Sequence, residues 1–205
     1  MSLFTRENLR AALREPGPAI DLVLAILRGK WVVMRARWRG VRITVGRNFR
    51  CHGKLVIAGK GTLSIGDDVV VRPNLRHVYI GSGSSDYEVS IGDRVWLHGT
   101  SIACRERVTI GDRSLVGRVE IVDHEFHDPR DLSRKQEIRT RPVVLAEDTW
   151  IGNDCMILKG VEIGRYSVVG ARTVVRRSLP ERVVAIGNPA QVVKELPPDE
   201  PSAAG

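Results

Sequence analysis

The fold of this chain is decided by residues 151–175, which read IGNDCMILKGVEIGRYSVVGARTVV. An aliphatic residue occupies every sixth position of this stretch, namely Ile151, Ile157, Ile163, Val169 and Val175. A period of six fits neither the period of about 3.6 of a helix nor the strict alternation of an ordinary strand. It is typical of a hexapeptide β-helix, in which short strands wind around a triangular tube. We therefore predict an all-β fold.

The six-residue period extends toward the N-terminus, with interruptions, as far as Val45. Residues one coil apart should stack about 4.8 Å from each other and form three aliphatic columns inside the tube. The first column contains Ile91, Ile110, Leu145 and Ile163, the second Leu97, Val116, Ile151 and Val169, and the third Ala103, Val122, Ile157 and Val175. Every member is aliphatic, so this register predicts a continuous apolar core.

The composition fits a narrow tube in a reducing compartment. Aromatic residues make up only 5% of the chain, and its three cysteines, Cys51, Cys104 and Cys155, show no metal-ligand spacing. Cys51 and Cys155 fall on inward positions, so we interpret them as small core residues and expect no metal. The charged start, MSLFTRENLRAALRE, does not resemble a signal peptide. We expect a cytoplasmic protein.

Positive charge is concentrated near the N-terminus. Residues 28–54 contain nine Lys or Arg and no Asp or Glu, whereas the whole chain carries a net charge of +8. Such a run implies an anionic partner. Nucleic acid is disfavoured because the run belongs to a helix with an apolar face and no nucleic-acid module is present. We expect residues 20–54 to make peripheral contact with an anionic membrane at its inner face.

The predicted N-terminal helix has an apolar face at three- and four-residue steps, formed by Ile20, Leu24, Leu27, Trp31, Met34 and Trp38. Its apolar run is far shorter than the roughly 20 residues that cross a bilayer. Two interpretations remain open. The helix either lies in a membrane interface or docks on the tube or on a neighbouring subunit.

We divide the chain into three parts. Residues 1–40 form a basic helical segment, and residues 41–187 form the β-helix, from which residues 123–144 are extruded as a polar loop that breaks the period. Residues 188–205 form a C-terminal cap and tail, and we expect residues 190–196 to fold back as a short helix.

The chemistry-bearing segment, VDHEFHD at residues 122–128, stands where the regular coils give way to the loop. A histidine beside carboxylates can act as an oriented general base near neutral pH. By the register, His124 should lie on the outer surface of the tube between Arg105 and Lys159, where the loop or the next subunit could close over it. Asp123 or Glu125 could fix its tautomer.

The IG-x4 coils, the DH-x2-H segment and residues 150–196 together resemble the hexapeptide-repeat acyltransferases. They are most similar to the sugar O-acetyltransferases, which include maltose and galactoside acetyltransferases and enzymes of surface-polysaccharide synthesis. The resemblance is specific over residues 89–196, looser over 43–88 and absent over 1–40. It implies a left-handed parallel β-helix, a homotrimer with active sites between subunits, and acetyl transfer from acetyl-CoA to a hydroxyl of a lipid-linked or surface saccharide.

The same resemblance implies the roles of individual residues. It makes a histidine at the position of His124 the general base. We prefer His124 over His127 because His124 keeps the coil register, and we expect His127 to hydrogen-bond the substrate or orient the loop. It assigns the pantetheine arm of acetyl-CoA to Trp150, Gly152, Asn153, Gly170 and Ala171, and the phosphates to Arg176 and Arg177. Gln191 stands where galactoside-type members have a basic residue, so Lys194 or Arg172 would replace that contact.

Three other functions remain open. The same mechanism could acylate the nitrogen of an amino sugar or transfer another acyl group. A metal enzyme of the carbonic-anhydrase type shares the fold, but it needs three histidine ligands and this chain has five histidines in all, of which His124 and His127 lie three apart. A non-catalytic scaffold would need neither His124 nor acetyl-CoA.

Overall fold

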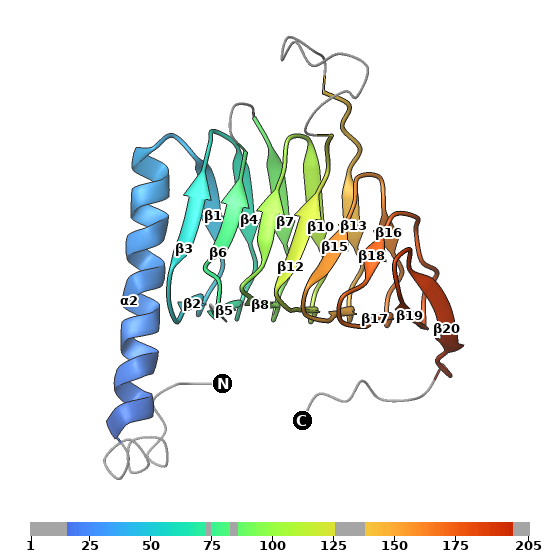
Figure 1. Ribbon diagram of the computed structural model, residues 1–205. Coiled ribbons are helices and arrows are strands. Elements are labelled where there is room, and N and C mark those ends of the chain that lie inside the picture. The colour runs from blue at the N-terminus through green and yellow to red at the C-terminus, as the bar shows by residue number, and fades with distance from the viewer. Residues whose placement is uncertain (1–15, 73–74, 83–85, 126–137, 199–205) are drawn as a thin grey trace.

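The computed structural model describes residues 16–72, 75–82, 86–125 and 138–198. Within these ranges a helix, α2 (Pro16–Trp38), is followed by short strands that wind into a tube (Figure 1). The strands are β1 (Arg42–Val45), β2 (Arg50–Cys51), β3 (Leu55–Ala58), β4 (Thr62–Ile65), β5 (Val70–Arg72), β6 (Val78–Gly81), β7 (Glu88–Ile91), β8 (Trp96–His98), β9 (Ser101–Ala103), β10 (Arg107–Ile110), β11 (Leu115–Val116), β12 (Val119–Val122), β13 (Val143–Leu145), β14 (Trp150–Ile151), β15 (Cys155–Ile157), β16 (Glu162–Ile163), β17 (Val168–Val169), β18 (Val174–Val175), β19 (Val183–Ile186) and β20 (Gln191–Glu195).

The strands form three sheets, which are the three sides of the tube. The first sheet has the order β1-β4-β7-β10-β13-β16, the second β2-β5-β8-β11-β14-β17-β19-β20, and the third β3-β6-β9-β12-β15-β18. Up to β17 and β18, each strand pairs in parallel with the strand three places further along the chain. At the end of the second sheet, β17 pairs in parallel with β19, and β19 pairs antiparallel with β20. The predicted parallel β-helix is therefore confirmed.

Two of the three predicted core columns are confirmed residue by residue. Ile91, Ile110, Leu145 and Ile163 pair in order along the first sheet, and Leu97, Val116, Ile151 and Val169 pair in order along the second. All eight side chains are buried. Spacing alone thus places these two sides of the tube correctly.

The third column is wrong by one residue in two coils. Ile121, not Val122, pairs with Ile157, and Ile102, which is completely buried, takes the place predicted for Ala103. In both coils the step from the second sheet to the third is five residues instead of six. The strands β9 and β12 each carry two adjacent apolar residues, so the period could not decide between them.

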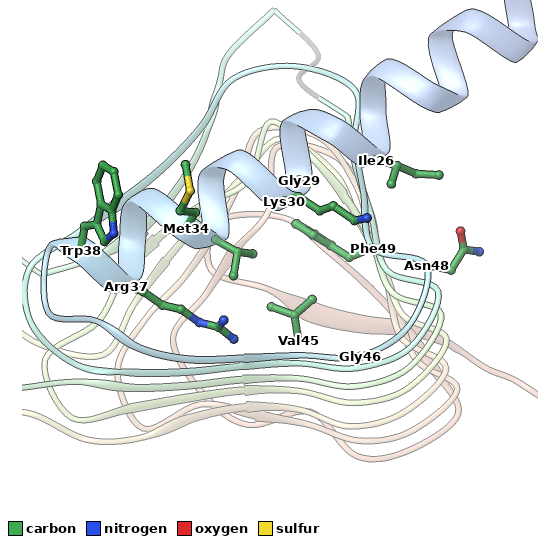
Figure 2. A pocket seen from close by; sticks show the side chains of 11 residues that line it. Ile26, Gly29, Lys30, Met34, Arg37, Trp38, Val45, Gly46, Asn48 and Phe49 are labelled. Carbon is green, nitrogen blue, oxygen red and sulfur yellow. The ribbon is translucent and has the colours of Figure 1, made fainter.

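Helix α2 covers the N-terminal opening of the tube (Figures 1 and 2). It packs on the first coil through small side chains, because Ala25, Gly29 and Ala36 are buried. A Cβ at Gly29 would stand 3.0 Å from the ring of Phe49, so glycine permits the close approach of the helix. Of the interpretations left open by the sequence, the structure shows docking on the tube, but the docked face is not the one with the large apolar residues.

The C-terminal opening is closed differently from the prediction. Residues 191–195 form β20, which pairs antiparallel with β19, and not a helix. The edge of β19 offers unpaired backbone groups to the returning chain. Val192 and Val193, both β-branched and both exposed, favour an extended strand there.

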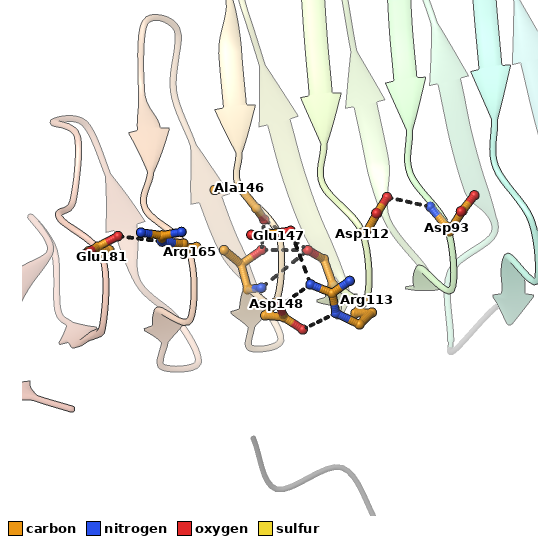
Figure 3. A network of polar contacts seen from close by, with 10 residues as sticks. Asp93, Asp112, Arg113, Ala146, Glu147, Asp148, Arg165 and Glu181 are labelled. Atoms are coloured by element: carbon orange, nitrogen blue, oxygen red, sulfur yellow. Dashed lines mark hydrogen bonds and ion pairs between the residues drawn. The ribbon is translucent and has the colours of Figure 1, made fainter. Parts of the chain in front are cut away.

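A ladder of carboxylates, which we call the corner ladder, joins successive coils where the first sheet turns into the second. Asp67 accepts the N–H of Arg47 at 2.7 Å, Asp93 that of Asp67 at 2.7 Å, and Asp112 that of Asp93 at 2.8 Å. Further along the same edge, Figure 3 shows Arg113 bonded to Asp148 and Arg165 bonded to Glu181.

The glycine that directly precedes each aspartate of the corner ladder makes this stacking possible. A Cβ at Gly92, for example, would overlap the Asp112 side chain of the next coil. The second residue after Gly92, Arg94, then has a positive φ of 57°. The corner therefore depends on close backbone approach at the glycine and a left-handed residue just after it.

Across the described residues, no helix combines the length and apolarity that a bilayer crossing requires.

Candidate active site

Asp123 lies at the corner where the third sheet turns toward the first, directly after β12. Its side chain is completely buried. The carboxylate accepts the backbone N–H groups of Arg105 at 2.9 Å and Glu106 at 2.7 Å, and the thiol of Cys104 lies 3.3 Å from Oδ2. These donors compensate the cost of burying a negative charge.

The imidazole of His124 is paired with this carboxylate. His124 Nδ1 lies 2.9 Å from Asp123 Oδ1, and the residue is only 9% exposed. An ionised carboxylate can only accept a hydrogen bond, so Nδ1 carries the proton in this pair. The basic nitrogen of the neutral ring is then Nε2. The sequence predicted that Asp123 or Glu125 would contact the ring of His124, and the structure shows that Asp123 makes the contact with Nδ1.

The returning limb of the loop, residues 138–142, closes over this corner. Thr140 forms an antiparallel bridge with His124. Glu125 N donates to Arg139 O at 3.1 Å, and Arg141 N donates to Asp123 O at 2.8 Å. His124 is therefore buried within a single chain, as the predicted closure by the loop allows, and not left open on the outer surface.

The predicted neighbours of His124 are partly different. The one-residue shift of the third column moves Lys159 out of line with His124, and Lys159 Nζ instead forms an ion pair with Glu125 at 2.9 Å. His127 lies outside the described residues, so its position relative to His124 is a prediction only.

Cys104 is the contact that the sequence did not single out. Its thiol is buried between Asp123 and the main chain. Burial raises the pKa of the Cys104 thiol far above its usual range, and the nearby charge of Asp123 raises it further. The thiol therefore remains protonated and can donate to the carboxylate. The signal was available, since Cys104 and Asp123 are 19 residues apart, about one coil.

The predicted pantetheine residues come together at a different corner, where the second sheet turns into the third. Trp150 ends up 54% exposed on β14, and Gly152 and Asn153 follow it. Gly170 and Ala171 occupy the same corner one coil later, and a Cβ at Gly152 would stand only 2.8 Å from Ala171 N. The corner offers an exposed indole beside main chain that an extended ligand can approach.

The predicted phosphate-binding residues lie on the edge that carries His124. Arg176 and Arg177 are exposed and follow β18, two coils beyond β12 in the third sheet. Within one chain, a full side of the tube separates this edge from the corner at Gly152. Within the single chain, His124 thus shares an edge with the two arginines but not with the predicted pantetheine residues.

Among the described residues, no three His, Cys, Asp or Glu side chains are grouped as a metal ion would require.

Comparison with known proteins identifies relatives of this chain. Residues 142–177 match the family model for the bacterial transferase hexapeptide (six repeats). The chain is 33% identical over 132 residues to the putative colanic acid biosynthesis acetyltransferase WcaF of Escherichia coli K12, covering 64% of this chain and 68% of the relative. It is 29% identical over 174 residues to the putative lipopolysaccharide biosynthesis O-acetyl transferase WbbJ of the same organism, covering 80% and 84%.

A solved structure shares the fold. The N-acyltransferase AntD of Bacillus cereus, in complex with dTDP and 3-hydroxybutyryl-CoA, superimposes with a TM-score of 0.63 over 80% of this chain and 88% of that chain, at 21% identity. At that identity the likeness concerns the fold alone. Together with the six-residue repeat and the match to WcaF, it shows that this chain belongs to the left-handed β-helix acyltransferases built from the bacterial transferase hexapeptide repeat.

Proposed function

We propose that this protein transfers an acetyl group from acetyl-CoA to a hydroxyl of a saccharide, with His124 as general base. The observation that carries the proposal is the buried pair of His124 Nδ1 and Asp123 Oδ1 at 2.9 Å, at the root of the loop. Two relatives named for acetyl transfer in colanic acid and lipopolysaccharide biosynthesis support a saccharide acceptor. A solved structure with the same fold contains an acyl-CoA, which supports a CoA donor.

The chemistry follows from the state of the ring. A sugar hydroxyl has a pKa far above neutrality, so it needs a base as it attacks the thioester carbonyl. Nε2 of His124 accepts the hydroxyl proton while the oxygen bonds to the carbonyl carbon. The carbon–sulfur bond then breaks, and the protonated ring returns the proton to the leaving thiolate of coenzyme A. Asp123 stabilises the imidazolium that exists between these steps.

A second protomer would complete the site. His124 and the two arginines lie along one edge of the third sheet, whereas the Gly152 corner lies along its other edge. In the homotrimer that we propose, the His124 edge of one protomer faces the Gly152 corner of its neighbour, and acetyl-CoA lies in the groove between them. Main-chain N–H groups at that corner would stabilise the oxyanion of the tetrahedral intermediate.

The decisive experiment measures acetyl transfer from acetyl-CoA to a panel of sugars and amino sugars. Removing a general base should lower kcat by about a thousandfold, so His124→Ala should lose nearly all transfer. His77→Ala is the matched control, because His77 is exposed and lies outside this corner. Full activity of His124→Ala would exclude the proposed base, and loss of activity in His127→Ala alone would transfer the role to His127. Preferential acetylation of amino sugars would replace O-acetylation by N-acetylation.

The proposed phosphate contacts have a separate signature. Replacing Arg176 and Arg177 by alanine should raise the KM for acetyl-CoA by about tenfold and leave kcat nearly unchanged, since the arginines bind the donor without touching the reacting atoms. A matched control is Arg107→Ala, which removes an exposed arginine from the first sheet. An unchanged KM would show that the two arginines only cover the tube end.

A further inference from the structure

Helix α2 has two apolar stripes on opposite sides. The first, through Ala25, Gly29 and Ala36, packs on the first coil. The second faces away from the tube, and its side chains are all at least 41% exposed: Ile20, Val23, Leu24, Leu27, Trp31, Met34 and Trp38. These residues recur at three- and four-residue steps and so lie along one side of the helix. We call this second set the outer stripe.

Basic side chains border the outer stripe on both sides. At helical spacing, Arg28 and Arg35 lie along one border and Lys30 lies along the other. Arg37 is also on the second border, but its guanidinium turns toward the tube and donates to Ile43 O at 3.3 Å. The guanidinium of Arg35 also stands over the ring of Trp31, 5.3 Å from its centre. Long basic side chains beside an apolar stripe can extend to headgroup phosphates while their stems stay on apolar surface. The acid of this helix, Asp21, is paired with His52 at 2.8 Å.

Two hollows flank the helix where it crosses the first coil. One, of about 460 Å³, is lined by Lys30 and Arg37 together with apolar side chains such as Phe49 (Figure 2). The other, of about 420 Å³, is lined by Arg28 and Arg35 together with apolar side chains of β3. Each hollow therefore combines positive charge with an apolar lining, which suits an anionic headgroup with the start of its acyl chain.

We propose that α2 holds the protein on a lipid surface that carries anionic headgroups. The helix would lie flat in the interface, with the outer stripe in the lipid and Trp31 and Trp38 at headgroup level. Charge favours this occupant over two others. A second copy of the helix would bring like-charged borders together. Residues 1–15 contain three arginines and two glutamates, so they too would add positive charge to a positive border.

This placement fixes how the tube stands on the membrane. Because α2 covers the N-terminal opening (Figure 1), the coils would rise away from the lipid. His124 follows β12, which is the fourth strand of the third sheet counted from that opening. Three strand spacings and the helix itself put His124 roughly 25 Å from the lipid. If the proposed function also holds, the acceptor hydroxyl belongs to a saccharide held at about that height.

The test is cosedimentation of the full chain with phosphatidylcholine vesicles, with and without phosphatidylglycerol, at low salt. We expect binding only when phosphatidylglycerol is present. The variant L27Q/W31Q/W38Q should lower vesicle partitioning at least about tenfold, because each change removes apolar contact with the lipid. The matched control, V192Q/V193Q, changes exposed apolar residues of β20 at the other end of the tube and should bind like the wild type. Circular dichroism checks that both variants stay folded.

Two outcomes would overturn the proposal: no binding of the wild type to phosphatidylglycerol vesicles, or equal binding of the outer-stripe variant and the wild type. If the wild type does not bind vesicles, and the outer-stripe variant has a smaller mass by light scattering than the wild type, a second copy of the chain covers the outer stripe. These readouts are independent of the proposed function. His124→Ala should bind vesicles normally, and the outer-stripe variant should still acetylate a soluble sugar.

Discussion

The corners at Asp112 and at Asp123 share one kind of hydrogen bond between coils and differ in what they can do. In each, an aspartate accepts an N–H of the preceding coil, from Asp93 at 2.8 Å and from Arg105 at 2.9 Å. Asp112 is partly exposed and repeats a contact that Asp67 and Asp93 also make. Asp123 is buried and receives a second N–H, a thiol and an imidazole.

The difference teaches how a repeat protein can gain a site without leaving its fold. The coil needs an acceptor at a corner, and an exposed aspartate is enough for that. At Asp123 the corner is covered by the returning limb at Thr140 and is followed by His124. There the carboxylate also fixes which nitrogen of the imidazole carries the proton. The catalytic proposal therefore depends on burial at Asp123 and not on the hydrogen bond that all these corners share.

The largest expected difference between the two corners is in activity. Asp123→Asn should lower kcat by about a hundredfold, because an amide cannot stabilise the imidazolium and its NH₂ group would face donors. Asp112→Asn should leave kcat within about twofold, since a neutral acceptor still satisfies an exposed corner. Steady-state acetyl transfer measures both, and the KM for acetyl-CoA should not change in either. Equal losses would mean that the corners act only through the fold.

Stability should separate the corners next. Asp123→Ala leaves the partly buried N–H groups of Arg105 and Glu106 and the buried ring of His124 without their acceptor, which should cost about 2–4 kcal/mol of unfolding free energy. Asp112→Ala leaves the N–H of Asp93 to hydrogen-bond with water, so it should cost about 1 kcal/mol or less of unfolding free energy. Urea denaturation at one fixed protein concentration compares them. A cost at Asp112 as large as that at Asp123 would contradict the role given to burial.

The sequence predicts most of the tube and less of its ends. A six-residue period with clean aliphatic columns leaves little choice of register, so the columns through Ile110 and Ile151 are correct. The third column fails because Ile121 and Val122 are both apolar and only packing decides which one faces inward. The same period identified the corner of His124, since the histidine follows directly where the repeat stops.

The ends depend on contacts that no repeat encodes. A helix with apolar residues on two sides does not reveal which side docks, and the small residues around Gly29 allow a closer approach than the large ones. The sequence of residues 190–196 taken alone is compatible with a short helix. In the structure residues 191–195 form a strand because they pair with the free edge of β19. The return of Thr140 onto His124 likewise requires the three-dimensional path of the loop.

Thiol reactivity gives a smaller test of the same comparison. Burial raises the pKa of Cys51 and Cys155, and at Cys104 the charge of Asp123 adds to burial. A raised thiol pKa stabilises the folded state below the usual value of 9.0, and that contribution is lost as pH rises above it. We expect no reaction of the native protein with a disulfide reagent at neutral pH, and reaction of all three thiols after unfolding. Rapid labelling of Cys104 in the native state would show that the Asp123 corner is open.

The smallest effect is expected at Asp67, an outer member of the corner ladder. The hydrogen bond from the Arg47 guanidinium holds the pKa of Asp67 below its usual value of 3.8. A lowered carboxyl pKa contributes stability that is present above pH 3.8 and is lost as the pH falls below it. Because Arg47 is exposed, salt screens the pair, and Asp67→Asn should move the acid unfolding midpoint by less than about half a pH unit. Acid titration followed by circular dichroism, in low and high salt, measures this shift. A large, salt-independent shift would show that the exposed ladder holds the coils together as strongly as the buried corner does, and the distinction between the two corners would then rest on His124 alone.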